Sequence, residues 1–139
     1  MSKAIENLEA ALRRAMTIRP RVGCFPYLAE TLRHAGVTRN FWFLPACQSL
    51  YLTNEGPIVT QGKPLATGTM DVSAFNREAL ISALRTDQAG ESSFPEFLEA
   101  SWRAGVVRYD VEFTARTVAY CGCYGEEYVE AYPAVAIDS

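Results

Sequence analysis

The sequence has a single histidine, His34, and it lacks long apolar runs and clusters of basic residues. The longest strongly apolar run, FWFL at residues 41–44, is far too short to span a bilayer. The net charge is −3, from 13 basic and 16 acidic residues without a basic block, so we expect no nucleic-acid partner. The N-terminal residues carry scattered charges and no apolar signal segment, so we expect a cytoplasmic protein that does not bind a membrane.

Sequence motifs of common enzymes are also missing. There is no G-x-S-x-G elbow, Walker loop, H-E-x-x-H helix or dinucleotide fingerprint. His34 lies near the expected end of a helix, where a lone histidine is structural or solvated far more often than catalytic. The sequence therefore leaves open whether the protein is an enzyme.

The four cysteines include no C-x-x-C pair. Cys121 and Cys123 are the closest two, and on a strand their side chains share one face. A zinc site needs better-spaced ligands, so the favoured interpretation is that these are reduced, small apolar residues of a core. We expect no metal site and no cofactor.

Apolar residues are frequent enough for a core: 49% of the 139 residues are hydrophobic and 12% are aromatic. This composition predicts one domain over residues 1–139 that needs no disulfide or metal. Periodicity and capping signals predict its elements. Helices are expected over 3–17 (with Ile5, Leu8, Leu12 and Met16 inward), 26–35, 76–85 and 93–104, and strands over 37–44, 48–53, 58–62, 106–113, 117–123 and 126–135.

Residues 25–56 and 94–125 resemble each other at an ungapped offset of 69 residues. Seven of the twenty positions 25–44 are identical to their partners, against roughly one or two by chance. A helix-to-strand corner that favours proline and glycine explains part of this match, but not the shared phenylalanine, glutamate and arginine. The repeat predicts two duplicated helix–strand–strand units. We therefore expect an α+β fold, with a mostly antiparallel sheet of about six strands and helices on one face.

The two copies differ in one strand. Asp110 and Glu112 of the second copy align with Phe41 and Phe43 of the first, so the first strand is apolar on both faces. Something must then cover Phe41 and Phe43. The leading candidate is the helix over residues 3–17, for which the second copy shows no counterpart. The alternatives are a homodimer contact and a small apolar ligand.

The stretches FPYLAETLRHAGVTRNFWFLPACQSLY (25–51) and DQAGESSFPEFLEASWRAGVVRYDVEFTARTVAYCGCYGEEYVEAYP (87–133) resemble the bacterial family catalogued as domain of unknown function 1398. Some members of that family are labelled phage envelope protein. The resemblance extends from about residue 22 onward and implies a small cytoplasmic bacterial protein without an established activity. It carries over no catalytic residues, and the CGC at 121–123 departs from the family pattern.

Two classes of function fit these observations. The first is a non-catalytic binding or interaction module, with a groove between the two repeat units. The second is a small hydrolase- or lyase-type enzyme that uses strand carboxylates and neighbouring tyrosines. The candidate ligand or partner surface combines both sets of residues: Phe41, Phe43, Tyr109, Asp110, Tyr120 and Glu126.

Overall fold

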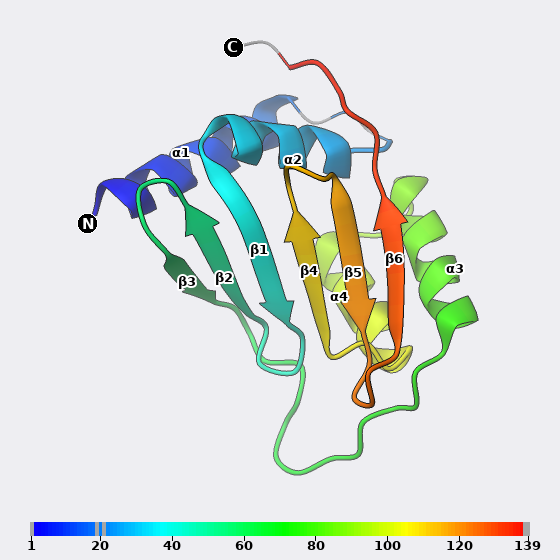
Figure 1. Cartoon of the computed structure of the whole chain (residues 1–139). Coiled ribbons are helices and arrows are strands. Elements are labelled where there is room, and N and C mark those ends of the chain that lie inside the picture. Colours follow the sequence, from blue (N-terminus) through cyan, green and yellow to red (C-terminus); the bar gives the residue numbers. More distant parts are fainter. Residues whose placement is uncertain (1, 19, 21, 138–139) are drawn as a thin grey trace.

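The computed structural model describes residues 2–18, 20 and 22–137, which form four helices and six strands (Figure 1). This arrangement confirms the α+β class and the six-stranded antiparallel sheet. In chain order the elements are α1 (Lys3–Ile18), α2 (Phe25–His34), β1 (Val37–Phe43), β2 (Gln48–Thr53), β3 (Ile58–Gln61), α3 (Arg77–Gln88), α4 (Phe94–Arg103), β4 (Arg108–Glu112), β5 (Thr117–Cys121) and β6 (Glu127–Ala131).

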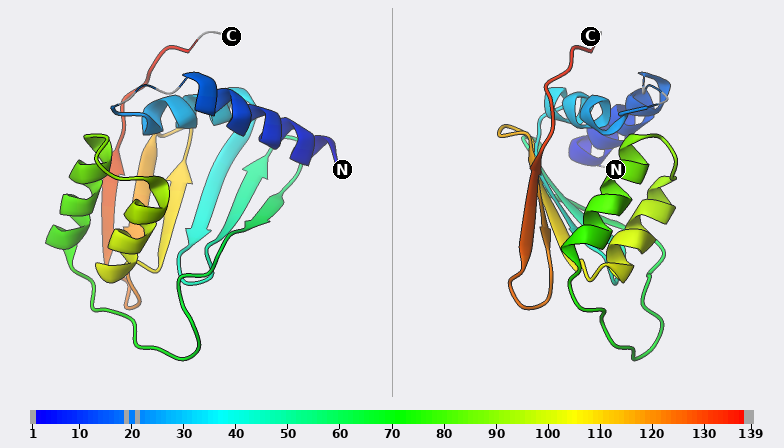
Figure 2. Two further views of the ribbon diagram at one scale, coloured as in Figure 1. Left: turned by 180° about the vertical axis from the view of Figure 1, so that it is seen from behind. Right: turned by 90° about the vertical axis from the view of Figure 1, so that its right-hand side faces the viewer.

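The strands lie in the order β3-β2-β1-β4-β5-β6, and every neighbouring pair is antiparallel. The right-hand view in Figure 2 shows the four helices on one side of the sheet. The helices α1 and α2 lie along the upper end of the sheet, and in Figure 1 α3 and α4 lie behind β4–β6. In the part of the chain that the structure describes, no helix is long and apolar enough to cross a membrane.

Each half of the chain contains two helices followed by three strands. The segments α2 and α4 begin 69 residues apart and end 69 residues apart, and β3 and β6 also begin at this offset. The helix α3 occupies the same place in the second half that α1 occupies in the first, and it packs on α4 as α1 packs on α2. The expectation that the N-terminal helix has no counterpart is therefore wrong.

Left-handed backbone conformations recur at the same offset. Gly36 and Gly105 have φ angles of 93° and 86° at the two helix-to-strand corners. The hairpin between β1 and β2 contains Cys47 with φ 48°, and Arg116 has φ 55° in the β4–β5 hairpin. These are the only non-glycine residues with positive φ among the described residues. The duplication itself stays a prediction, and this agreement supports it.

The two halves meet where β1 pairs with β4. The register of this pair places Phe41 beside Asp110, which is also 69 positions later, and Trp42 beside Tyr109. Equivalent residues of the two halves therefore meet at the centre of this antiparallel pair. Outward from the pair the strands follow in the same order, β1-β2-β3 on one side and β4-β5-β6 on the other. The two halves of the sheet are therefore related by an approximate twofold axis that is perpendicular to the sheet and passes between Phe41 and Asp110.

Local capping follows the sequence. The Oγ of Ser2 accepts a hydrogen bond from the backbone N–H of Ile5 at 3.2 Å, and Asn76 caps α3 through the N–H of Ala79. Ser93 and Glu96 form the expected capping box of α4. These contacts satisfy N–H groups that a helix leaves unpaired at its start.

The helix α1 does not cover Phe41 and Phe43. It buries Ala4, Leu8, Ala11 and Ala15 beside α2, on the other side of the sheet, and leaves Met16 exposed. Of the four residues expected to point inward, Leu8 is buried, and Ile5 and Leu12 are partly buried against the core. Only Met16 departs from the expected stripe. The last strand is also shorter than expected and ends at Ala131, two residues before Pro133, which has no N–H to donate.

We predict that Gly105→Ala destabilises the protein more than Gly36→Ala. Both substitutions strain a left-handed backbone, which costs about 1–2 kcal/mol. A Cβ at Gly105 would also lie 2.5 Å from the carbonyl oxygen of Ala74, whereas at Gly36 the nearest atom is the side-chain amide of Asn54 at 3.1 Å. Overpacking against backbone adds about 1–3 kcal/mol at Gly105. Urea unfolding of the two variants measures the difference, and equal losses would contradict this account.

Candidate functional site

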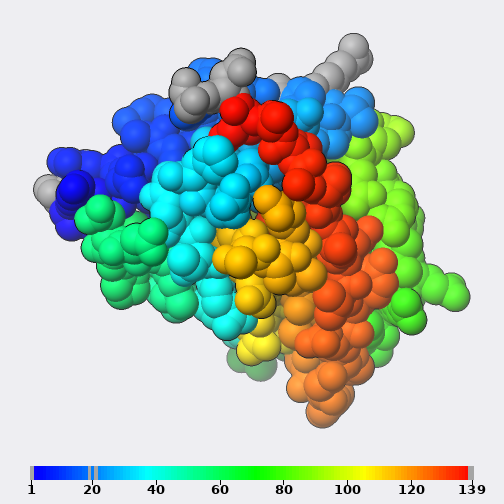
Figure 3. Space-filling model, turned by 45° about the horizontal axis from the view of Figure 1, so that its top comes forward, coloured from blue at the N-terminus to red at the C-terminus, as the bar shows by residue number. Residues whose placement is uncertain are grey.

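One face of the sheet carries no helix, and we call it the open face. In Figure 3 the strands form a continuous surface with no helix in front of them. Because side chains alternate between the two faces of a strand, the register of the six strands defines three rows on this face. The rows are Gln61, Gln48, Phe43, Arg108, Cys121 and Glu127; Val59, Leu50, Phe41, Asp110, Ala119 and Val129; and Leu52, Arg39, Glu112, Thr117 and Ala131.

An apolar band, interrupted by Asp110, runs across the open face. Val59 and Val129, at the two ends of the middle row, are 61% and 51% exposed, and Leu50 between them is 38% exposed. Phe43 in the adjacent row is 49% exposed. Large apolar side chains that share one face of a sheet and remain in solvent are typical of an interaction surface.

The charges on the open face are unevenly divided between the two halves. The half formed by β4–β6 carries Asp110, Glu112 and Glu127, and the Nε of Arg108 lies 3.1 Å from Oδ1 of Asp110. The half formed by β1–β3 carries Arg39, whose guanidinium lies 4.8 Å from the ring centroid of Phe41. One half is therefore apolar with a cation, and the other is acidic with smaller side chains.

A shallow hollow of about 380 Å³ lies at one end of the open face, between Phe43, Arg108, Cys121 and the β5–β6 turn. The Nη2 of Arg108 is 3.7 Å from Sγ of Cys121. Burial raises the pKa of the Cys121 thiol, and the hydrogen bond from Arg108 lowers it in part. Since its net pKa is above the ordinary value, Cys121 is mostly a neutral thiol at pH 7 and a poor nucleophile.

Tyr109 and Tyr120 lie on the opposite, helix-covered face and are buried in the core. Their ring centroids are 5.6 Å apart, and Trp42 stacks beside Tyr109. Burial raises the pKa of both phenols well above 10, so they stay neutral. The expectation that these tyrosines share one surface with Phe41, Phe43 and Asp110 is not met, because alternate residues of β4 face opposite sides of the sheet.

Glu126 closes the turn between β5 and β6. Its Oε1 accepts a hydrogen bond from the backbone N–H of Tyr124 at 2.8 Å. A Cβ at Gly122 would lie 2.7 Å from the same oxygen, so only glycine fits there without moving the carboxylate. Glu126 borders the hollow, but its main contact is structural.

Sequence reasoning missed three residues of the open face, which are Leu50, Val59 and Val129. The alternation in QSLYLT and IVTQ contained the signal. The alternation alone does not reveal which set of alternate residues the helices cover. The structure buries Ser49 and Tyr51, where Asn40 donates a hydrogen bond to Ser49 at 2.7 Å.

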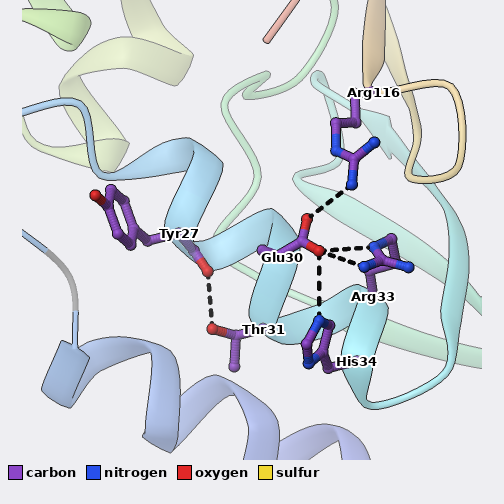
Figure 4. Close-up of polar contacts among 6 residues, drawn as sticks. All are labelled: Tyr27, Glu30, Thr31, Arg33, His34 and Arg116. Atoms are coloured by element: carbon purple, nitrogen blue, oxygen red, sulfur yellow. Dashed lines mark hydrogen bonds and ion pairs between the residues drawn. The ribbon is translucent and has the colours of Figure 1, made fainter. Parts of the chain in front are cut away.

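A second polar cluster surrounds the buried carboxylate of Glu30 on α2 (Figure 4). Its Oε1 accepts a hydrogen bond from Nε of Arg33 at 2.9 Å and lies 3.4 Å from Nε2 of His34. Its Oε2 lies 3.6 Å from Nη2 of Arg116, in the β4–β5 hairpin. The hydrogen bond from Arg33 lowers the pKa of Glu30, against the effect of burial, and the charges of Arg33, Arg116 and His34 add to the lowering.

The Glu30 cluster connects α2 of the first half to a hairpin of the second half. Cationic partners face this one buried carboxylate from two elements, and they compensate for its loss of solvent. The arrangement is therefore an ionic contact that holds the two halves together. Among the described residues, no group of three or more His, Cys, Asp and Glu side chains is arranged to hold a metal ion.

The chain is similar to uncharacterised mycobacterial proteins. It is 56% identical over 135 residues to the uncharacterised protein Rv2012 of Mycobacterium tuberculosis, covering 97% of this chain and 82% of that protein. The same values apply to the uncharacterised protein Mb2035 of Mycobacterium bovis. The chain belongs to this mycobacterial family. No family model matches the chain, so its resemblance to domain of unknown function 1398 stays a prediction.

We predict that Glu30→Gln destabilises the fold, whereas Glu99→Gln at the equivalent position of the second half does not. The Glu30 side chain is 7% exposed and the Glu99 side chain is 53% exposed, with one ion pair to Arg103. Loss of the charged hydrogen bonds costs about 1–3 kcal/mol at Glu30. The exposed pair at Glu99 contributes about 0–1 kcal/mol.

The effect at Glu30 depends on pH with a defined sign. The folded-state pKa lies below the ordinary value of 4.5, so the stabilisation is present above that pH and is lost as the pH falls through the folded-state pKa. Denaturant unfolding at pH 7 and at successively lower pH below 4.5 should show the difference in stability between the wild-type protein and the Glu30→Gln variant becoming smaller. A difference that stays constant at acid pH would contradict this role for the carboxylate.

Proposed function

We propose that this member of the mycobacterial family is a non-catalytic interaction module and that the open face of the sheet is its binding surface. The observation that supports this most is the exposed apolar band of Val59, Leu50 and Val129, with Phe43 beside it. An antiparallel sheet with one solvated face usually presents polar side chains to water. An apolar band in that position loses contact with water when a partner covers it, which favours association.

The partner that fits the open face is a macromolecule. Small-molecule sites are concave and mostly apolar, with a few polar groups. The hollow beside Phe43 is shallow, and the charged residues Arg108, Glu126 and Glu127 make up much of its lining. A broad face built from rows of side chains on six strands instead suits another protein surface.

The groove expected between the two repeat units is filled on the helix side. There Trp42 of β1 lies between Phe94 and Tyr109, with ring centroids 5.3 Å and 6.2 Å away. We call the β1–β4 pair the seam between the two halves. The proposed binding surface lies on the open face of this seam, at Phe41 and Asp110. The duplication remains part of the proposal, because equivalent strands on both sides of the seam supply the binding surface.

The enzymatic alternative receives less support from the geometry. It needs carboxylates beside tyrosine hydroxyls, and the sheet separates Asp110 from Tyr109 and Tyr120. We also propose that the protein works in the cytoplasm. All four cysteines are free, and Cys123 is exposed, which suits a compartment that keeps thiols reduced.

Site-specific photo-crosslinking tests the proposed function. The photoreactive residue p-benzoylphenylalanine replaces Leu50 on the open face or, as the control, the exposed Met16 on α1, in the full chain expressed in its own bacterium. We expect light-dependent protein adducts from position 50 and not from position 16, because only the open face is covered in the cell. Folded protein that gives no adduct from position 50 would contradict the proposal.

A further inference from the structure

We infer that the partner of the open face is a second copy of this chain, packed face to face about a twofold axis that runs parallel to the strands. The inference rests on the proposed function and specifies its partner. Two copies related by such an axis place the β1–β3 half of one open face over the β4–β6 half of the other. The argument for this geometry comes from size, charge and area.

The two halves of the open face have complementary side-chain sizes. With the axis along the seam between β1 and β4, Leu50 of one copy lies opposite Ala119 of the other, and Leu52 lies opposite Thr117. Large side chains thus meet small ones where β2 faces β5, as interdigitating sheet faces require. At the edges of the sheet, Val59 lies opposite Val129. A twofold axis perpendicular to the strands would instead place Leu50 opposite Leu50 and Ala119 opposite Ala119. The two large side chains would then hold the sheets apart, and the two alanines would not reach each other.

The charges are complementary in the same arrangement. Arg39 of one copy lies opposite Glu112 of the other, and the ring of Phe43 lies opposite the guanidinium of Arg108. The first contact pairs opposite charges, and the second is a cation–π contact. Phe41 covers Asp110, whose charge Arg108 already balances at 3.1 Å. The twofold axis perpendicular to the strands would place Asp110 opposite Asp110, which is a like-charge contact.

The area of the open face fits a weak dimer. Six strands about 4.8 Å apart span about 24 Å, and five residues along a strand extend about 17 Å. The projected area is thus about 400 Å², and protruding side chains increase the accessible area toward the ~600 Å² per partner of the smallest specific interfaces. An interface of this size belongs to the weak, transient class of complexes.

A charge-pairing experiment tests this geometry. The variants are Leu50→Glu and Ala119→Lys, because β1 and β4 separate these two residues within one chain and the proposed dimer brings them together between chains. In the dimer of each variant alone, the new charge lies against an apolar side chain of the other copy, so we expect self-association to weaken at least ~10-fold. In an equimolar mixture, the heterodimer combines one opposite-charge pair with one native contact, and we expect its affinity within ~3-fold of wild type.

The matched control is the variant Leu50→Lys, which puts the opposite charge at the same position. Mixed with Ala119→Lys, this variant brings like charges together, and we expect no recovery of association. Sedimentation velocity from ~1 to ~500 μM measures all species, because a weak, transient dimer forms only at high protein concentration. Circular dichroism of each variant checks that the fold is intact, and both positions lie on the solvent side of the sheet.

A wild-type protein that remains monomeric throughout this range would overturn the inference, as would equal recovery in the opposite-charge and like-charge mixtures. These failures are distinguishable from failure of the proposed function. Cross-linked adducts from position 50 with a mass other than twice that of the chain, together with a monomer in sedimentation, would retain the binding surface and replace its partner. The absence of any adduct would remove the binding surface as well.

Discussion

The pairing of β1 with β4 is the contact on which the rest of the structure depends. It joins two three-stranded sheets into one, and its register brings Phe41 beside Asp110 at the centre of the sheet. Because both halves place their helices on the same side of this joined sheet, one side holds the aromatic core and the other stays open. The core at Trp42 and Tyr109 and the open face at Phe41 and Asp110 are two sides of the same seam.

Equivalent positions of the two halves have different environments, and these differences define the molecule. Glu30 is buried among cations because the β4–β5 hairpin extends over α2, whereas Glu99 faces solvent. Gly105 lies against the backbone of the segment that leads into α3, and Gly36 meets only a side chain. The fold is therefore similar in its two halves at the level of the backbone, and it is asymmetric where side chains meet.

The same asymmetry gives the open face its character. One half presents phenylalanine, leucine and valine, and the other presents carboxylates, alanine and threonine together with Arg108 and Val129. A face with both halves apolar would favour indiscriminate aggregation, and a face with both halves charged would remain hydrated. When two copies of such a face are related by a twofold axis parallel to the strands, the apolar half of each copy lies opposite the acidic half of the other. Family members such as Rv2012, at 56% identity, provide sequences in which this division can be compared.

The sequence by itself determined the elements and their order. Ser93 and Glu96 predicted the start of α4. The offset of 69 residues predicted that Gly36 and Gly105 occupy the same kind of helix-to-strand corner. Both features could be predicted because caps and left-handed corners depend on residues close together in the chain. The tertiary structure decided which alternate residues of β2 face the helices. Ser49 and Tyr51 are buried while Leu50 is exposed, and α1 packs on α2 rather than over Phe41. Periodicity alone is the same for both faces of a strand, and only the packing of all four helices on one side distinguishes the two.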